Sequence, residues 1–320
     1  MKKRILAVLI ATALAVSVTG CAGNTTSSSD STSASSVAES SDTSTQTSSD
    51  ASSEDESKEE SSQEESKDLE ANYTKYTLDG DLTQHMIDMS RLNEGNKVRL
   101  ANVIKKLKNG EEVTVGFIGG SITQGTSAGN DLCYAKLTAD WLQKTYSNAK
   151  INYVNAGIGA TGSYIGVHRV ENDLLSKNPD LVFVEFSVND TTENTERNKK
   201  SYDGLLRTIW KSSTNPAIIT IATTQEDGTS FQDQHAEIVK HYDLPMISYR
   251  NTILDTIKHG DIVWKDISDD NIHPNVPGHK IVSQLLQAYI SDVDKDVDNI
   301  SGSESDFTTP ATDAPIAVSY

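Results

Sequence analysis

Three residues at two distant points of the chain have the types and spacing of a serine nucleophile and its base. Ser121 follows two glycines in the stretch FIGGSITQG, directly after the apolar run VTVGFI. Asp270 and His273 lie three residues apart much later in the chain. A serine hydroxyl attacks only when a base within hydrogen-bonding reach takes its proton and a carboxylate orients that base. In a turn or a first helical coil, this spacing returns a carboxylate to the imidazole of the same segment.

The glycine-rich stretch around Ser121 also fits a helix cap or a phosphate-binding loop, so it leaves three interpretations open when taken alone. A Walker-type loop needs a lysine after its last glycine, and none follows Gly119 or Gly125. Residues 157–162 match a dinucleotide-binding glycine pattern, but Asp180, the acid at the expected distance, precedes the next strand instead of ending it. The sequence therefore disfavours nucleotide binding.

An acyl-transfer site also needs hydrogen-bond donors for the oxyanion that forms during attack. The backbone N–H groups of Ser121 and Gly157 and the side-chain amide of Asn189 could point inward from neighbouring strand ends. A glycine is expected to matter at position 157 because a side chain there would crowd the acyl oxygen.

The elements that would position these residues alternate along residues 71–290. Apolar runs that predict strands cover 113–118, 151–155, 181–186, 217–222 and 245–249, and helical patterns cover 92–108, 132–146, 164–176, 197–212, 231–242, 251–258 and 277–290. This alternation predicts a three-layer α/β/α sandwich with a mostly parallel five-stranded sheet. Sites form at the carboxyl ends of such strands, and Ser121, Gly157 and Asn189 each follow one.

Four sequence blocks in this order resemble the SGNH hydrolases, also called the GDSL esterase superfamily. The blocks are Gly-Gly-Ser-Ile at 119–122, Asn-Ala-Gly at 155–157, Asn-Asp at 189–190 and Asp-x-x-His at 270–273. The resemblance implies a flavodoxin-like fold and an esterase site with no cofactor. It assigns Ser121 as nucleophile, His273 as general base, Asp270 as its orienter, and Ser121, Gly157 and Asn189 as oxyanion donors.

Two positions depart from the family pattern. Gly120 replaces the acid of the Gly-Asp-Ser-Leu form, and Ser187 replaces the glycine two residues before the asparagine. Neither position supplies a catalytic group, so they bear on the subfamily. An α/β-hydrolase elbow fits less well, because Thr123 stands where that elbow needs glycine.

The N-terminus combines the basic residues 2–4 with an apolar run from Ile5 to Val18 and then Gly20-Cys21. This layout resembles a bacterial lipoprotein signal, with residues 1–20 removed and Cys21 lipidated. We therefore expect the mature protein to be anchored on the outer face of the bacterial membrane.

Both ends of the mature chain are acidic and carry most of the net charge of −18. Residues 24–70 hold 18 serines and 13 acids, and residues 21–70 are predicted to be a disordered tether. Residues 291–320 are predicted to be a disordered acidic tail. No basic stripe indicates nucleic-acid binding.

Cysteine and histidine usage adds no further chemistry. Cys133 has no partner other than the predicted lipidation site and is expected to be buried. The remaining histidines lack metal-ligand spacing, so no metal site is predicted, and His279 is expected to be structural. Asp269 competes with Asp270 for the orienting role.

These observations predict a surface-anchored serine esterase that removes acyl groups, first of all O-acetyl groups from a polysaccharide. Two other interpretations stay open. A lipase or lysophospholipase should have an apolar lid, which the polar segment 191–203 does not resemble. A non-catalytic glycan-binding protein would have no use for Ser121, Asp270 and His273.

Overall fold

The computed structural model describes residues 73–78, 80–191 and 194–316. The predicted signal peptide, the lipidation site Cys21 and the tether 21–70 lie outside these residues. All described residues belong to one unit of the chain, Ser53–Tyr320.

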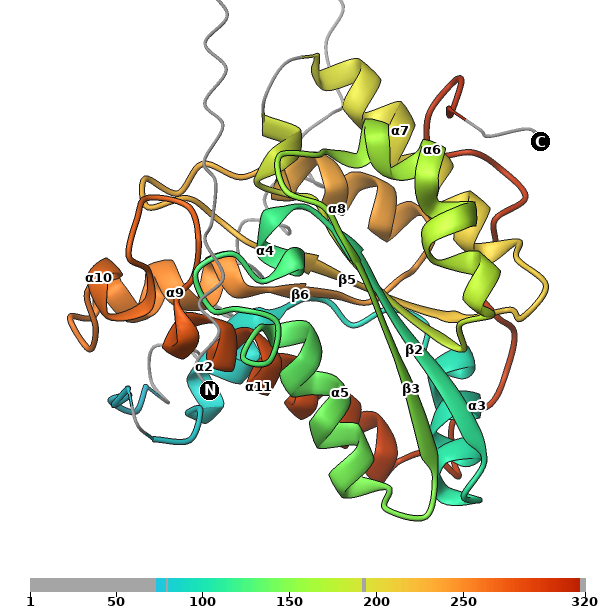
Figure 1. The fold of residues 1–320 in the computed structure, drawn as a ribbon, viewed down its shortest axis with the longest axis horizontal. Helices are drawn as coiled ribbons and strands as arrows, with labels where there is room; N and C mark the ends of the chain where they lie inside the picture. Colours follow the sequence, from blue (N-terminus) through green and yellow to red (C-terminus); the bar gives the residue numbers. More distant parts are fainter. Residues whose placement is uncertain (1–72, 79, 192–193, 317–320) are drawn as a thin grey trace, which may run out of the picture. The chain divides into compact units, whose positions relative to one another are not determined.

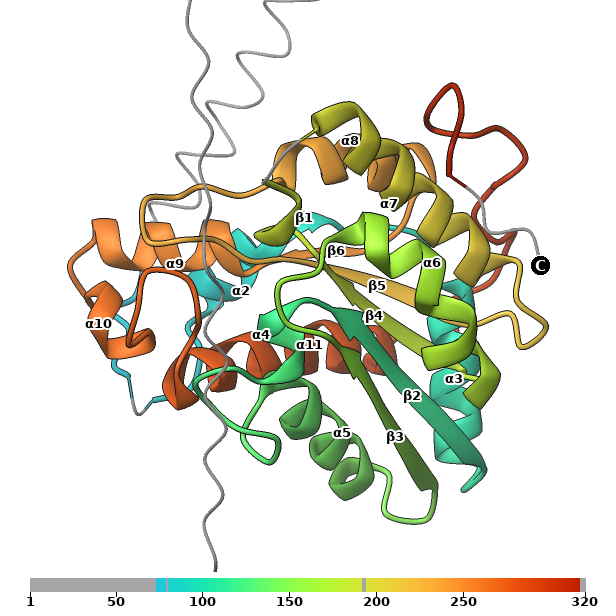
Figure 2. The ribbon, with the colours of Figure 1, turned by 45° about the horizontal axis from the view of Figure 1, so that its top comes forward.

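A central sheet has the strand order β1-β6-β5-β4-β2-β3, which can be followed across Figure 2. The strands are β1 (Arg91–Asn93), β2 (Glu112–Gly119), β3 (Lys150–Gly157), β4 (Leu181–Glu185), β5 (Ala217–Ala222) and β6 (Met246–Ser248). The five predicted strands all form and all run parallel. Strand β1 is an additional edge strand, antiparallel to β6.

The segment predicted as one helix over 92–108 divides into β1 and a shorter helix, α3 (Val98–Lys108). Gly95 separates the two with φ of 61°, a left-handed conformation that favours glycine. A β-carbon at this position would overlap the backbone of Leu244 and Pro245. This close approach to the residues that immediately precede β6 is a tertiary contact that the local helical pattern does not contain.

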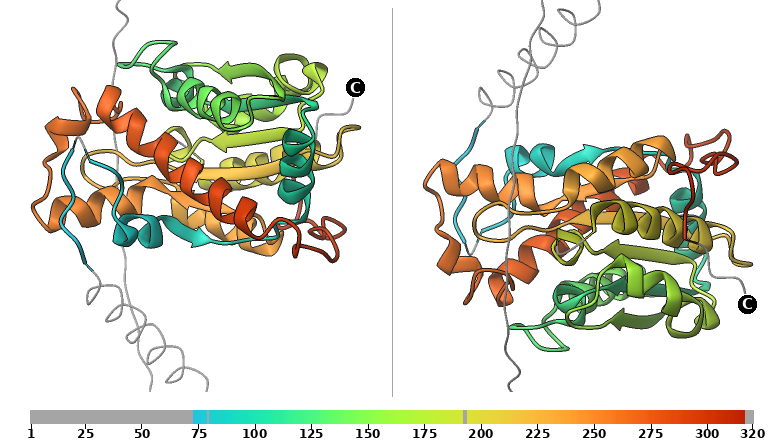
Figure 3. Two further views of the ribbon diagram at one scale, coloured as in Figure 1. Left: turned by 90° about the horizontal axis from the view of Figure 1, so that it is seen from below. Right: turned by 90° about the horizontal axis from the view of Figure 1, so that it is seen from above.

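Helices cover both faces of the sheet, as Figures 1 and 3 show. One face packs against α2 (Gln84–Ser90), α3, α5 (Tyr134–Thr145), α9 (Tyr249–Lys258) and α11 (Val276–Lys295). The other packs against α6 (Ser163–Asp173), α7 (Thr195–Trp210) and α8 (Gln232–His241). Short turns of helix are α4 (Ser121–Gln124), η1 (Leu175–Lys177), η2 (Asn189–Thr191) and α10 (Trp264–Ile267). The predicted three-layer arrangement is confirmed.

The central strands are apolar throughout because alternate side chains enter opposite cores. In β4, Leu181 and Phe183 join one core, whereas Val182 and Val184 join the other. Each fully buried side chain of this size contributes about 1.5–3 kcal/mol of transfer free energy. Cys133, at the start of α5, is fully buried in the first core, as expected. Among the described residues, no helix combines the length and the apolar character needed to cross a membrane.

Three central strands end in register at one edge of the sheet. Gly119 at the end of β2 pairs with Gly157 on one side and with Glu185 on the other. The loops that follow these strands therefore start side by side, as expected for the site of a parallel sheet.

The acidic C-terminal segment differs from the predicted disordered tail. Helix α11 continues to Lys295, and the structure describes the chain to residue 316. Phe307 is 5% exposed and stacks on Tyr242 and Trp210, with ring centroids 3.9 and 4.5 Å away. The prediction of disorder rested on the acidic composition of thirty residues, which does not register the packing of a single aromatic side chain against two rings.

We expect Phe307→Ala to lower the free energy of unfolding by about 3 kcal/mol, because it removes a buried aromatic ring. Urea unfolding followed by circular dichroism measures this change. Ser303→Ala, an exposed substitution in the same segment, is the control and should change little. Equal unfolding midpoints for the Phe307→Ala variant and the unsubstituted protein would contradict the packing role of this segment.

Candidate active site

Ser121 lies at the carboxyl edge of the sheet as the first residue of α4. Gly119 ends β2, and Gly125 ends α4 with φ of 101°. The first N–H groups of a helix have no acceptor within the helix, so the N–H of Ser121 faces outward from the turn. The sharp strand-to-helix turn therefore presents both the hydroxyl and the N–H of Ser121 at the edge.

The structure brings Ser121, His273 and Asp270 into one chain of hydrogen bonds. Ser121 Oγ lies 2.9 Å from His273 Nε2, and His273 Nδ1 lies 2.8 Å from Asp270 Oδ2. An ionised carboxylate only accepts, so Nδ1 carries the proton and Nε2 accepts from the serine hydroxyl. This is the arrangement of a nucleophile, a base and an orienting acid.

The second oxygen of Asp270 holds the loop itself. Its Oδ1 accepts hydrogen bonds from the backbone N–H groups of Ile272 and His273, at 2.7 and 2.6 Å. Partial burial opposes ionisation, but hydrogen bonds from His273 and Ile272 hold the pKa of the Asp270 carboxyl below its ordinary value. The carboxylate therefore stays ionised in moderately acidic solution.

Two further residues, whose role the sequence did not indicate, hold this loop through hydrogen bonds to its carbonyls. The indole N–H of Trp264 donates to the carbonyl of Asp270 at 2.7 Å. Ser268 Oγ lies 2.8 Å from the same carbonyl and 2.6 Å from that of His273, and Ser268 pairs with Pro274 in an antiparallel bridge. Asp269 points elsewhere, since its Oδ1 lies 3.5 Å from the side chain of Asn275. The orienting contact is therefore made by Asp270.

Gly157 does not have the geometry predicted for an oxyanion donor. Its N–H donates to Asn155 Oδ1 at 2.9 Å and is not directed at Ser121. A β-carbon at 157 would overlap the backbone N–H of Gln124 in α4. The glycine is required by the close packing of α4 on β3, which corrects the expectation that it leaves room for the acyl oxygen.

The next part of the same loop does approach Ser121. A β-carbon at Gly159 would lie 3.9 Å from that of Ser121. Ala160 follows with φ of 58°, and its N–H donates no hydrogen bond to any other described residue.

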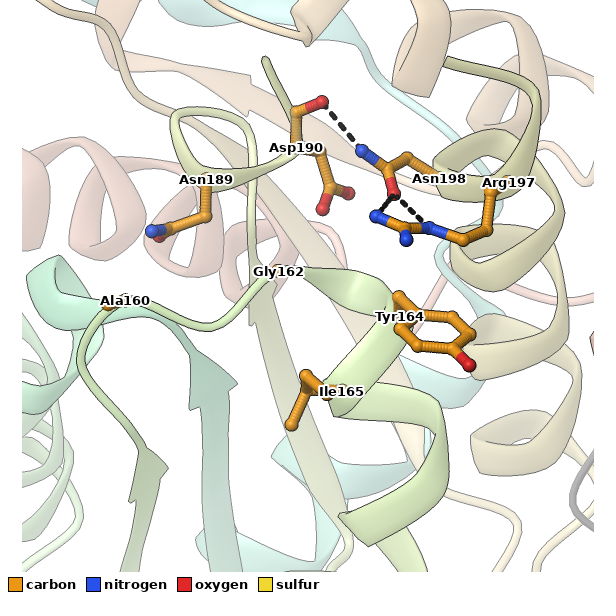
Figure 4. A pocket seen from close by; sticks show the side chains of 8 residues that line it. All are labelled: Ala160, Gly162, Tyr164, Ile165, Asn189, Asp190, Arg197 and Asn198. Carbon is orange, nitrogen blue, oxygen red and sulfur yellow. Dashed lines mark hydrogen bonds between the residues drawn. The ribbon is translucent and has the colours of Figure 1, made fainter. Parts of the chain in front are cut away.

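Asn189 begins η2 shortly after the end of β4 at Glu185, as the sequence predicted. Its amide lies against Gly120, where a β-carbon would overlap Asn189 Oδ1. Asn189 and Ala160 line one hollow beside the turn (Figure 4). The departure from the family pattern at 120 therefore leaves space for the amide of Asn189.

Polar side chains that are buried or partly buried fix the strand ends beneath these loops. Arg169 donates to the carbonyls of Ala156 and Gly119, which joins the ends of β3 and β2. Glu185, at the end of β4, accepts from the hydroxyls of Ser187 and Thr223. Complete burial raises the pKa of the Glu185 carboxyl. These contacts give Arg169 and Glu185 structural roles.

Asp190 fixes the loop after β4 in the same manner. Its Oδ1 accepts from the N–H of Ser163 at 2.7 Å, and its Oδ2 lies 2.9 Å from His235 Nε2. Asp190 is 1% exposed, so it links the start of α6 to α8 from within the protein.

Among the described residues, one group of side chains could hold a metal ion: His85, Asp255 and His259. It joins α2 to the C-terminal end of α9. Asp255 Oδ2 lies 2.6 Å from His85 Nε2 and 3.2 Å from His259 Nδ1, so both imidazoles contact one carboxylate oxygen. The sequence did not predict this group, because the two histidines lie far apart in the chain.

Comparison with known proteins gives one family and two similar structures at high coverage. The GDSL-like lipase/acylhydrolase family model matches residues 117–281. A two-domain esterase active on acetylated mannans is 38% identical, with a TM-score of 0.68 over 71% of this chain and 61% of the other. The same esterase co-crystallised with mannopentaose gives a TM-score of 0.66 at the same identity, over 71% and 60% of the two chains.

The chain therefore spans about three fifths of the length of that two-domain esterase. Comparison with curated proteins gives no significant match.

His279 packs behind the site and is uncharged in the folded protein. It is fully buried, and its Nδ1 accepts from the N–H of Tyr134 at 3.1 Å. Burial lowers the pKa of His279 to about 4. The structural role predicted for His279 agrees with this environment.

We expect the protein to lose stability as the pH falls from about 6.5 to 4. In that window the unfolded chain binds a proton at His279 that the folded chain does not, which costs on the order of 3 kcal/mol. The free energy of unfolding in urea should therefore differ less between pH 7 and pH 4 for His279→Gln than for the unsubstituted protein. His168→Gln, at an exposed histidine, is the control. An unchanged pH dependence in His279→Gln would contradict the neutral buried state.

Proposed function

The chain belongs to the GDSL-like lipase/acylhydrolase family, and on that premise we propose that it is a serine esterase that removes O-acetyl groups from a polysaccharide. The observation that carries the proposal is the pair of hydrogen bonds from Ser121 to His273 and from His273 to Asp270. Membership of the family and the hydrogen-bonded order of these groups support the same chemistry independently.

In the first half-reaction, Ser121 Oγ attacks the ester carbonyl while His273 Nε2 takes the hydroxyl proton. Asp270 stabilises the resulting imidazolium through Nδ1. The tetrahedral intermediate collapses as His273 returns the proton to the leaving sugar oxygen, and an acyl-Ser121 remains. Water then attacks the acyl group with His273 again as base, and the acid is released.

We assign the oxyanion contacts to the N–H groups of Ser121 and Ala160 and to the side-chain amide of Asn189. The loop that contains Ala160 passes Ser121, and Ala160 shares a hollow with Asn189. Donors held in place before the reaction stabilise the developing charge without reorganising. Ala160 thus replaces Gly157 in the donor set expected from the sequence.

The substrate class rests on the similar esterase that is active on acetylated mannans and on the character of the hollow. Arg197, Asn198 and Asp190 line the hollow beside Asn189, so its wall is largely polar. These groups suit sugar hydroxyls better than a fatty chain. Acetylated mannan is accordingly the first polysaccharide to test.

A lipase is disfavoured by the segment 191–203, which the sequence predicts to be too polar for an apolar lid. Residues 195–203 form the first half of α7, and Asn198, Ser201 and Asp203 are buried there. A packed helix with buried polar anchors is not an apolar flap. No observation on the described residues favours a non-catalytic glycan-binding role.

We also propose, from the lipoprotein-like sequence around Cys21, that the esterase is anchored to the outer face of a bacterial membrane. The tether 21–70 would then give it reach toward a polymer outside the cell. This proposal is independent of the catalytic one.

We expect Ser121→Ala to lower acetate release from acetylated mannan by at least about 10³-fold, since it removes the nucleophile. Ser147→Ala, at an exposed serine, is the control and should leave the rate unchanged. Colorimetric p-nitrophenyl esters of increasing chain length separate an acetylesterase from a lipase. Full activity in Ser121→Ala would contradict the mechanism, whereas a preference for long chains would contradict only the substrate class.

We expect Gly120→Ala to lower kcat by about 10²–10³-fold with little change in KM, because the new methyl group displaces the amide of Asn189. Its φ of −87° suits alanine, so the backbone should tolerate the change. Asn189→Ala should have a similar effect, and the double variant should lose little more. A wild-type kcat in Gly120→Ala would show that Asn189 is not an oxyanion donor.

A further inference from the structure

A hollow of about 230 Å³ lies between the first turns of α6 and α7, next to the proposed oxyanion donors. Figure 4 shows Asn189 and Ala160 on one side of it and Tyr164 and Arg197 on the other. Pockets that enclose drug-sized ligands are typically about 300–1,000 Å³, so this hollow suits one sugar ring better than an oligosaccharide.

A group bound in this hollow would lie beside the reacting ester, because Asn189 and Ala160 belong both to the hollow and to the proposed oxyanion site. An ester has an acyl side and an alcohol side. A cationic guanidinium and two carboxamides are unfavourable surroundings for an acyl methyl group. The methyl group would remove water from these polar groups and offer them no hydrogen bond in return. The chemistry therefore indicates the alcohol side, which is the sugar.

Arg197 is held in this hollow before any ligand arrives. Its carbon Cζ lies 4.6 Å from the centroid of the Tyr164 ring, which is a cation–π contact. Its Nε and Nη2 each lie 3.4 Å from Asn198 Oδ1. The N-cap residue Asn194 accepts from the backbone N–H of Arg197, which fixes the first turn of α7.

The support for Arg197 continues into the protein interior. Asn198 is 2% exposed, and its Nδ2 donates to the carbonyl of Asp190 at 2.9 Å. Asp190 in turn contacts Ser163 and His235, as described above. The guanidinium is thus oriented by a buried polar network. The same network holds Asp190, which is next to Asn189 in the sequence.

Ile165 completes the character expected of a sugar site. It lines the hollow on the α6 side and is 44% exposed, so its aliphatic surface is accessible to a ligand. A pyranose presents C–H groups on its faces and hydroxyls at its edge. An exposed aliphatic side chain beside a planar, cationic donor matches both.

We propose that Arg197, oriented by Tyr164 and Asn198, binds hydroxyl groups of the sugar unit that carries the ester or adjoins it. The proposal rests on the esterase function proposed above and assigns its sugar specificity to this hollow. Arg197 is then a specificity-determining residue that binds substrate without taking part in proton transfer. Tyr164 and Asn198 are positioning residues, which act through Arg197.

The test compares two acetyl esters, one with a sugar and one without. We expect Arg197→Ala to lower kcat/KM on acetylated manno-oligosaccharides by about 10–100-fold, mostly through KM, because hydrogen bonds to a charged group are lost. Its kcat/KM on p-nitrophenyl acetate should stay within about threefold. Tyr164→Ala should show the same split more weakly, whereas Tyr164→Phe should resemble the unsubstituted enzyme because it keeps the ring. Lys211→Ala, which removes a cation at the other end of α7, is the matched control.

Each outcome separates the two proposals. Equal losses on both esters in Arg197→Ala would overturn the sugar subsite and leave the esterase intact. Activity of the unsubstituted enzyme on p-nitrophenyl acetate, with no better activity on acetylated mannan or xylan oligosaccharides, would do the same. A preference for uronate-bearing oligosaccharides would replace hydroxyl recognition by carboxylate recognition. Inactivity on every acetyl ester would instead refute the proposed function.

Discussion

The contacts of a single carboxylate, that of Asp270, determine the geometry of the candidate site. One oxygen accepts hydrogen bonds from two backbone N–H groups of its own loop, and the other accepts a hydrogen bond from the imidazole of His273. The first oxygen therefore sets the shape of the loop, and the second sets the tautomer and orientation of the ring. Because the loop closes on itself, His273 reaches Ser121 as part of a small rigid unit. Trp264 and Ser268 attach that unit to the domain through carbonyls, so neither competes with the imidazole for the second carboxylate oxygen of Asp270.

Beneath the site, the ends of the parallel strands are joined by polar side chains that are partly or completely buried. Such groups are costly to bury unless hydrogen bonds compensate for lost hydration. Arg169 contacts two strand-end carbonyls, and Glu185 and Asp190 contact hydroxyl, N–H and imidazole groups from neighbouring loops. The ends of a parallel sheet have no further strand residues to satisfy their carbonyls. Arg169 donates to two of these carbonyls in place of the missing ladder, whereas the carboxylates of Glu185 and Asp190 accept hydrogen bonds from the loops that follow the strands.

The parts of the fold and site that follow from local pattern could be predicted from the sequence. The five parallel strands are short apolar runs between amphipathic helices, and Asp270 and His273 interact within one loop. The donor role expected of Gly157 failed because the direction of its N–H depends on the side chain of Asn155. The same residue type was required at 157 for another reason, the packing of α4.

Other features depend on contacts between distant segments and leave no local signal. His85 and His259 meet at Asp255 only because α2 packs on α9. Likewise, Phe307 is one aromatic residue in an acidic stretch, and its ring partners lie on α7 and after α8. The residues beyond 281, where the family match ends, also bring Glu304 to Arg99, whose guanidinium covers Trp210. This segment hides aromatic faces and surrounds them with negative charge, two properties that oppose self-association. Its consequence is colloidal: a chain that ended with α11 would keep its catalytic residues and its core but would expose these aromatic faces, and it would precipitate more readily.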